Sequence, residues 1–353
     1  MQSNSRILVA PLNWGLGHAS RCIPVIKALI ENGFEPILAS DGVALLFLKK
    51  EFPDLMAIEL PSYGISYAKS GKYLKFKLIR ESPRIFNAIR REKIQVRAIV
   101  SEFGIKGIIS DNRLGVRHKS IPSVIITHQL NVLSGSTTMF STKIHLKYIK
   151  KFDACWVPDF KDEPSLSGRL GHRDSYPIPA EFLGVISRFN YKKQPIKFDL
   201  LVILSGPEPQ RSFLEEKLTE QLIKYPGSVC IVQGKIEQEQ TKTTTANLTI
   251  VNFMTHEELE ILINSCRVIL SRSGYTTILD LAKIGKKAFL IPTPGQFEQE
   301  YLADRLDKMG IIPSSSQDDF DIEQLKRVAD YCGFEPHEQT VKFDKLFSLF
   351  KGK

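Results

Sequence analysis

Short apolar or β-branched runs alternate along the chain with longer stretches in which apolar residues recur at helical spacing. Alternation of this kind predicts an α/β fold with parallel sheets covered by helices on both faces. In the first half, the predicted elements are strands at residues 7–10, 36–39, 107–110, 123–127 and 154–157, and helices at 20–32 and 42–51. In the second half, the predicted strands are residues 200–204, 228–232, 248–251, 268–270 and 288–291.

This pattern stops and restarts around a basic, proline-containing stretch, residues 182–195. A chain of 353 residues also suits two domains better than one. We therefore predict an N-terminal domain over residues 1–186, a linker over 187–197 and a second domain over 198–335. Residues 336–353 follow as a C-terminal segment whose helix is expected to pack back on the first domain. The polar stretch 235–247 is typical of an exposed loop.

Composition narrows the classes of protein that remain. The five cysteines are scattered and form no Cys-x-x-Cys pair, which argues against a zinc site and favours reduced thiols in a cytoplasmic protein. No run approaches the ~20 apolar residues that span a bilayer, and the N-terminus does not read as a signal peptide. The formal net charge of +9 favours an anionic partner, which is nucleic acid, an acidic lipid or a phosphorylated substrate.

A basic segment interleaved with apolar residues, Lys69–Lys93, carries nine Lys or Arg residues and two Glu residues. This mixture is typical of a surface helix that binds an anionic membrane, which would place the protein peripherally on the inner leaflet. A solvated helix with a core-facing apolar stripe has the same composition, so both interpretations stay open. Nucleic-acid binding is less favoured, because no nucleic-acid motif accompanies the segment.

The most informative stretch lies in the second half, where an apolar strand ends in the turn Ser271–Gly274 and a helix follows. The start of a helix favours an anion, because its backbone N–H groups and its dipole both point there. Asp280 lies six residues past Gly274, and a carboxylate at such a place accepts ribose hydroxyls in other nucleotide folds. The stretch therefore predicts a site for a nucleotide diphosphate, with the N–H groups of Ser273, Gly274 and Tyr275 on the phosphates.

In the first half, the opening strand is followed by Gly15, Gly17 and His18. The two glycines allow close approach of a ligand to the backbone, although many α/β turns carry such a pair only to join strand and helix. His18 is more specific, because open α/β folds place ligands at the carboxyl ends of their strands. We expect His18 to be functional.

Polar residues also follow two later strands of the first half, namely Asp111 on one and His128 and Asn131 on the other. Polar groups that converge on one edge of a sheet form a plausible pocket. Asp111 and Asn131 are equally good helix N-caps, so a purely local role is the alternative for both.

Two further places in the second half could contact a nucleotide. Ser205 and Gly206 form a turn between a strand and a helix, where a phosphate could bind, although the prolines around them remove N–H donors. Phe253 and Met254 follow another strand and either bracket a base edge or belong to the core.

With these residues in view, the chain resembles the GT-B glycosyltransferases, and within them the group of the peptidoglycan N-acetylglucosaminyltransferase, which acts on a lipid-linked sugar. The resemblance covers most of the chain. Its motifs are a Gly-rich turn ending in His18, His-x-x-Asn at 128–131, Gly-x-x-x-Arg at 184–188, Ser-Arg-Ser-Gly at 271–274 with an acid six residues on, and paired Gln residues at 299 and 300. The chain departs from the family in having the shorter Asp280, Glu300 for the second Gln, and a phosphate loop, Ser205–Pro207, that is not glycine-rich.

The resemblance implies a fold of two facing Rossmann-like domains with an interdomain cleft. It also implies roles: His18 as the base that deprotonates the acceptor, and Arg188 near the nucleotide. The remaining donor-side residues are Ser205, Gly206, Phe253, Met254, Ser273, Gly274, Tyr275, Thr276, Asp280, Gln299 and Glu300, the last two on the sugar hydroxyls. The acceptor-side residues are Gly15, Gly17, Asp111, His128 and Asn131.

The expected function is therefore transfer of a hexose-type sugar from a UDP-sugar to a hydroxyl acceptor, possibly lipid-linked. We expect no cofactor and no metal, because a helix dipole and fixed donors can stabilise the leaving diphosphate. One alternative is a nucleotide-sugar 2-epimerase of the same fold, which Glu298 and Glu300 favour. The other is a non-catalytic protein that binds anionic lipid or nucleic acid.

Overall fold

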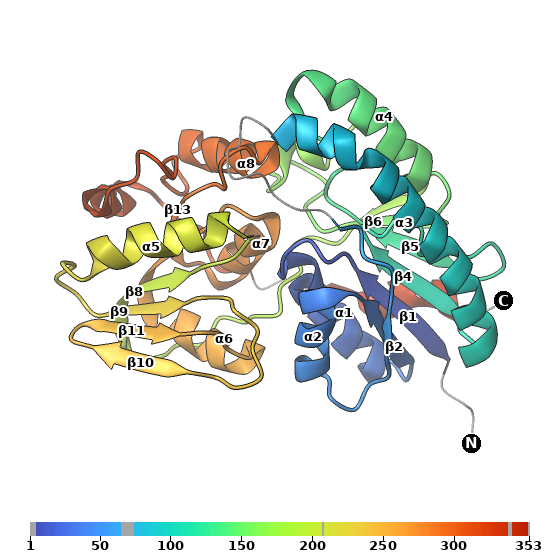
Figure 1. Ribbon diagram of the computed structural model, residues 1–353, viewed down its shortest axis with the longest axis horizontal. Helices are drawn as coiled ribbons and strands as arrows, with labels where there is room; N and C mark the ends of the chain where they lie inside the picture. Colours follow the sequence, from blue (N-terminus) through green and yellow to red (C-terminus); the bar gives the residue numbers. More distant parts are fainter. Residues whose placement is uncertain (1–4, 65–73, 207, 338–340, 352–353) are drawn as a thin grey trace. The chain divides into compact units, whose positions relative to one another are not determined.

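The computed structural model describes residues 5–64, 74–206, 208–337 and 341–351, and it describes the side chains of the helix at 74–103 from Pro83 onward. The chain forms two compact units (Figure 1). Of the described residues, 5–64, 75–186 and 341–351 make up the N-terminal unit, and 187–337 make up the C-terminal unit.

The N-terminal unit is built on a seven-stranded parallel sheet. In spatial order its strands are β3 (Ala57–Glu59), β2 (Glu35–Ser40), β1 (Arg6–Pro11), β4 (Gly107–Asp111), β5 (Ser123–Ile126), β6 (Ala154–Val157) and β7 (Ala180–Phe182). The central strands are almost wholly buried, because helices cover the sheet, and this explains their uninterrupted apolar sequences. The short edge strands β3 and β7 were not predicted.

The helices of this unit are α1 (Gly17–Glu31), α2 (Gly42–Glu51), α3 (Leu74–Phe103) and α4 (Thr138–Ile149), with short 3-10 turns η2 (Gly135–Thr137) and η3 (Gly168–Leu170). On α3, Ala88 and Ile89 of the basic segment are buried in one apolar cluster with Leu12 and Tyr63. The described part of α3 thus has the core-facing apolar stripe that was one interpretation of the basic segment. Residues 65–73 of that segment lie outside the described residues, as do the side chains of 74–82.

The C-terminal segment packs on the N-terminal unit through α9 (Phe343–Phe347) and the 3-10 turn η5 (Ser348–Phe350). The ring of Phe347 lies 6.2 Å from Trp156 and 5.8 Å from Phe34, centroid to centroid. Phe350 covers the start of β4 so closely that a Cβ on Gly107 would lie 2.2 Å from its ring. Phe350 can therefore pack here only because residue 107 has no side chain.

The C-terminal unit has a six-stranded sheet. In spatial order its strands are β10 (Lys242–Thr245), β11 (Leu248–Val251), β9 (Val229–Val232), β8 (Phe198–Ile203), β12 (Cys266–Ser271) and β13 (Lys287–Leu290). All pairs are parallel except β10 with β11, which form a hairpin. The prediction of a loop at 235–247 is wrong at Lys242–Thr245, because a run of Thr residues at the sheet edge pairs through its backbone while its side chains stay exposed.

The helices of the C-terminal unit are α5 (Gln210–Leu222), α6 (His256–Asn264), α7 (Tyr275–Ile284), α8 (Phe297–Lys308) and the 3-10 helix η4 (Ile322–Asp330). The expected linker, residues 187–197, is anchored on this unit. The backbone N–H of Asn190 donates to Glu260, and the backbone N–H of Lys192 donates to Asn264. No helix in the described part of the chain is long and apolar enough to cross a bilayer.

Candidate functional site

Each sheet has one point where the strand order reverses direction. In the N-terminal unit it lies between β1 and β4, and in the C-terminal unit between β8 and β12. Open α/β sheets bind ligands at the carboxyl ends of the two strands that flank such a point. The loops that follow these four strands contain most of the residues selected from the sequence.

At the β1 and β4 ends, His18 pairs directly with Asp111. The Nδ1 atom of His18 lies 2.7 Å from Oδ1 of Asp111. The structure begins α1 at Gly17, three residues before the predicted start, so His18 belongs to the first turn of the helix rather than to the loop. Nδ1 also lies 3.0 Å from Nη2 of Arg21, but its shorter contact is with the ionised carboxylate, which can only accept. We therefore assign the proton to Nδ1, which leaves Nε2 as the basic nitrogen of the ring.

Arg21, which the sequence analysis did not select, completes this pair. Its side chain is 1% exposed, and its Nε and Nη2 atoms donate to the two oxygens of Asp111 over 2.8 and 2.5 Å. Burial alone would raise the pKa of Asp111, but Arg21 and then His18 more than offset it and hold the pKa below its usual range. Asp111 is therefore a permanent anion beside the His18 ring.

His128 extends the cluster from β5. Arg21 Nη1 lies 3.2 Å from Nδ1 of the buried His128, so this nitrogen accepts and the ring is neutral. Burial, and then the electrostatic interaction with His128, lower the pKa of His145 on α4 to about 4. Its Nε2 atom is buried without a hydrogen-bond partner in the described structure. The cluster around the buried Arg21 guanidinium thus includes the neutral ring of His128.

The capping alternative is wrong for Asp111, whose carboxylate is bound to side chains at the end of β4. Asn131 caps no helix either. Its amide nitrogen donates to the carbonyls of Arg169 and His172, and its oxygen accepts from Arg173, so it fastens the loop around η3. Of the two glycines, Gly15 has φ +75°, the left-handed region that favours glycine, and Gly17 is the first residue of α1.

At the β12 end, the turn Ser271–Gly274 leads into α7 as predicted. Gly274 is the N-cap and has no side chain with which to cap the helix. The Ser273 hydroxyl donates to the carbonyl of Gln299 over 2.8 Å, which fixes the turn against the start of α8. Tyr275 is buried, and Thr276 is partly buried beside it. The helix start is therefore held in place by neighbours while its N-cap supplies no side-chain acceptor, which suits an anionic ligand.

Asp280 lies further along α7, partly buried. The Ser187 hydroxyl donates to its Oδ1 atom over 2.6 Å. Burial raises the pKa of Asp280 to about 6, and the positive charge of Arg188 and the Ser187 hydrogen bond act in the opposite direction. The structure thus brings Asp280 and Arg188 together, two residues that the sequence selected separately.

Gln299 and Glu300 are adjacent in sequence but have different surroundings. Gln299 is 8% exposed, and it accepts from the Thr293 backbone and donates to Gln296. Glu300 is exposed and lines a hollow of about 460 Å³ with Pro292 and serines 314–316. Successive helical residues point about 100° apart, which explains the difference. Contacts of either residue with a sugar stay a prediction.

The β8 end presents Ser205 and Gly206, and Gly206 adopts φ +102°. Thr293, missed by the sequence analysis, lies beside it: a Cβ on Gly206 would be 3.8 Å from the Thr293 hydroxyl. That hydroxyl is buried without a partner in the described structure. Phe253 is 7% exposed and Met254 is partly buried, so Phe253 also serves the core.

Known proteins resemble this chain in sequence and in fold. Residues 209–347 match the glycosyltransferase family 28 C-terminal domain. This stretch of the chain is therefore a glycosyltransferase domain of family 28. The chain is 21% identical to the UDP-N-acetylglucosamine–N-acetylmuramyl-(pentapeptide) pyrophosphoryl-undecaprenol N-acetylglucosamine transferase of Glaesserella parasuis, over 88% of this chain and 84% of that protein. It is 35% identical to the transferase of the same name from Methylobacterium radiotolerans, but this match covers only 22% of this chain and 21% of that protein.

Solved structures show the same fold. MurG of Acinetobacter baumannii superposes with a TM-score of 0.55 at 14% identity and covers 99% of both chains. The glycosyltransferase VinC in complex with dTDP superposes with a TM-score of 0.56 at 12% identity, over 98% of this chain and 95% of that one. The expected GT-B fold is thereby confirmed.

Two features of the structure concern residues that the sequence analysis did not select. Arg272, within the Ser271–Gly274 turn, is 1% exposed and donates to Gln210, Ile291, Pro292 and Gln317, so it ties the ends of neighbouring elements together. An Asp-x-Asp triplet occurs at 319–321, but Phe320 is buried in the core. Asp319 accepts from Ser316 and Asp321 caps η4, so these carboxylates are used locally.

Proposed function

We propose that this glycosyltransferase moves a hexose-type sugar from a UDP-sugar to a hydroxyl acceptor and needs no metal ion. The observation that carries the proposal is the 2.7 Å pair of His18 and Asp111 at the reversal point of the N-terminal sheet. A histidine held by a buried anion at a ligand-binding edge has the form of a general base.

In this reaction the acceptor hydroxyl gives its proton to Nε2 of His18 as its oxygen attacks the anomeric carbon. The imidazolium that forms is stabilised by Asp111 through the Nδ1–H hydrogen bond. Asp111 does not itself take up the proton, because Arg21 keeps it ionised. Arg21 therefore positions the pair, and its own two bonds to Asp111 fix the plane of the carboxylate.

On the donor side, we assign the start of α7, residues 273–276, to the diphosphate. Negative charge develops on the diphosphate as the glycosidic bond breaks, and a helix start stabilises such charge. Asp280 is assigned to the ribose hydroxyls, and Arg188 and the Gly206–Thr293 pair to the neighbourhood of the nucleotide. The sugar is assigned to Gln299 and Glu300.

The nucleotide and the acceptor are supported by the names of relatives. UDP-N-acetylglucosamine is the donor in the names of two relatives, and an undecaprenol-linked sugar is their acceptor. We extend both to this protein as a UDP-sugar donor and a lipid-linked acceptor, with the protein on the cytoplasmic membrane surface through Lys69–Lys93. The dTDP complex of VinC is the reason to test other nucleotides.

The test is a thermal-shift panel of UDP, GDP, dTDP and CDP, each with magnesium and with EDTA. UDP should stabilise most, by the same amount in both conditions. Incubation with a UDP-sugar alone then separates transfer from 2-epimerisation, because only an epimerase changes the donor without an acceptor. Preference for another nucleotide, or an absolute need for magnesium, would contradict the respective part of the proposal.

A further inference from the structure

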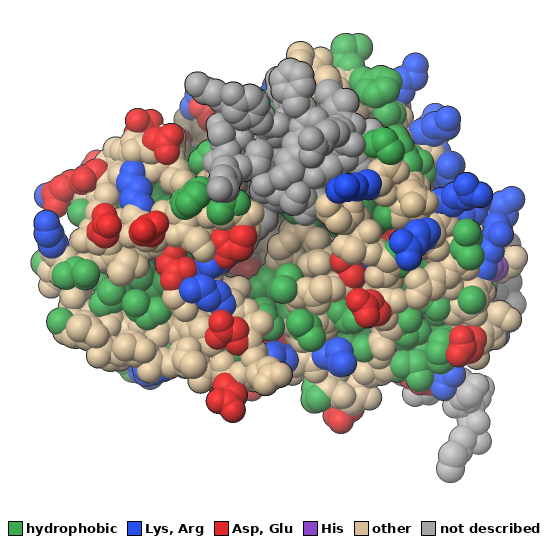
Figure 2. Space-filling model, viewed as in Figure 1, with side chains coloured by type: hydrophobic (Ala, Val, Ile, Leu, Met, Phe, Trp, Pro, Cys, Tyr) green, Lys and Arg blue, Asp and Glu red, His purple; other side chains and the backbone are tan. Residues whose placement is uncertain are grey.

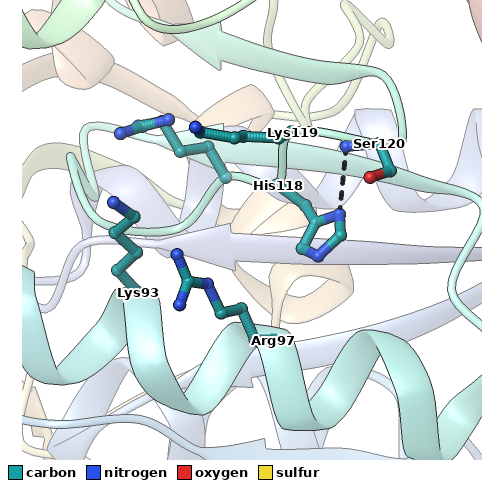
Figure 3. A pocket seen from close by; sticks show the side chains of 6 residues that line it. Lys93, Arg97, His118, Lys119 and Ser120 are labelled. Carbon is teal, nitrogen blue, oxygen red and sulfur yellow. Dashed lines mark hydrogen bonds between the residues drawn. The ribbon is translucent and has the colours of Figure 1, made fainter.

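A second cluster of charge lies on the N-terminal unit, away from the His18–Asp111 pair. Lys93 and Arg97 rise from α3 towards His118, Lys119 and Ser120 in the loop before β5 (Figure 3). Together with Arg117 of the same loop, these residues line a hollow of about 200 Å³. This loop leads into the start of β5, whereas Asp111 stands at the carboxyl end of β4. The hollow and the candidate catalytic edge therefore lie at opposite ends of the parallel strands.

Four of the six lining residues are cations, and none is an acid. Within the described part of the chain, no ion pair involves Lys93, Arg97, Arg117 or Lys119. Figure 2 shows Lys and Arg side chains gathered over α3, at the right of the view. Like charges this close repel one another, so the cluster of four cations lowers the stability of the fold.

Repulsion between these cations lowers the pKa of several of them. Arg117 and then Arg97 lower the pKa of Lys93, and burial together with Arg97 lowers the pKa of Arg117. The cluster continues to the end of α4, because burial, Arg117, Lys147 and Lys93 all lower the pKa of Lys151. Three separate elements thus bring cations to one place.

The uncharged groups of the hollow fit the same kind of ligand. The Nδ1 atom of His118 accepts from the backbone N–H of Ser120 over 3.2 Å, so the proton of the neutral ring is on Nε2, which is a donor. At about 200 Å³ the hollow is smaller than the roughly 300–1,000 Å³ of sites for drug-sized ligands. It suits a small anion rather than a whole nucleotide.

We propose that the hollow formed by Lys93, Arg97, Arg117 and Lys119 binds a phosphate group. Several N–H donors around one compact anion match the oxygens of a phosphate, and arginine in particular binds phosphate through two parallel hydrogen bonds. The group belongs either to a free phosphorylated molecule or to a lipid headgroup. This site is separate from the proposed donor site and does not depend on the UDP assignment.

The test compares the wild type with an Arg97→Gln/Lys119→Gln variant, in which two exposed cations of the hollow lose their charge. A Lys49→Gln/Lys106→Gln variant is the control, because it removes the same charge from exposed positions outside the hollow. Binding of inorganic phosphate is measured by isothermal titration at constant ionic strength, and the binding that the hollow variant retains reports any other phosphate site. A parallel arm measures sedimentation with vesicles that contain phosphatidic acid, against vesicles of neutral lipid.

The hollow variant should bind phosphate at least about tenfold more weakly than the wild type, while the control variant is unchanged. In chloride buffer the hollow variant should also melt no lower than the wild type, because repulsion is relieved. Phosphate should raise the melting temperature of the wild type and of the control variant but not that of the hollow variant. Binding to phosphatidic acid vesicles that the hollow variant loses and the control variant keeps, without binding of free phosphate, supports the site and identifies a lipid headgroup. Absence of both, or equal losses in the two variants, overturns the proposal.

Discussion

Lowering the pH from about 8 to about 5 should weaken the binding of uridine roughly tenfold, because Asp280 takes up a proton in this range. Ribose hydroxyls donate to a carboxylate, so the ionised form of Asp280 is the form that binds. Its pKa is raised from 3.8 to about 6, mainly by burial. At pH 5 about one tenth of the molecules are ionised, and the apparent affinity falls by the same factor.

Uridine is the right probe because it has the ribose but no phosphate, and the phosphates of UDP titrate near the same pH. Isothermal titration across the range should give an affinity that rises with pH and levels off above about pH 7. The matched variants are Asp280→Asn, which should bind weakly at every pH, and Ser187→Ala. Since the Ser187 hydrogen bond lowers the pKa of Asp280, its loss should move the midpoint of the curve upwards.

The pH dependence of stability gives an independent check, because stability should fall over the pH range in which uridine affinity rises. The folded-state pKa is above the unfolded value, so the fold favours protonated Asp280, and stability is lost as the pH rises from about 4 through 6. Asp280→Asn should therefore raise the free energy of unfolding by about 1–3 kcal/mol at neutral pH and by almost nothing at pH 4. A wild-type uridine affinity that does not change with pH, in a protein that remains folded, would refute the ribose assignment.

Three further predictions concern the N-terminal unit. His18→Ala should reduce turnover about 10²-fold or more and leave UDP affinity unchanged, which steady-state kinetics and titration can separate. Asp111→Asn should lower the free energy of unfolding by about 3–5 kcal/mol in urea titrations, since it leaves the buried Arg21 without its counter-charge; a loss of activity with full stability would contradict this. Gly107→Ala should cost about 1–3 kcal/mol through overpacking against Phe350, and a double variant with Phe350→Ala should cost less than the sum of the single variants.

The central strands could be predicted from the sequence because helices cover both of their faces, so apolar residues follow one another without interruption. The strands that escaped, β3, β7 and β10, are short edges. Ala57–Glu59 and Ala180–Phe182 are three residues each, and Lys242–Thr245 is fully exposed. Edge strands form through backbone pairing, which leaves little trace in the pattern of apolar residues.

Most residues of the candidate site could be selected from the sequence, but their pairings could not. His18 and Asp111 are far apart in sequence, and only the order of the strands brings β1 and β4 together. Arg21 looks like an ordinary helical arginine. Two signals pointed to it: spacing of three residues from His18 puts both on one helix face, and an Asp at the end of a buried strand requires a cation nearby.

The packing of Phe347 and Phe350 on the N-terminal unit bears on how the protein is made. During translation, the seven strands of this unit emerge long before the last turn that covers Trp156 and Gly107. Residues 343–350 are synthesised after the whole C-terminal unit, so the N-terminal unit is completed only once that second unit has been made. Until then the nascent protein exposes an aromatic surface, and a chain cut before Phe343 would keep it exposed.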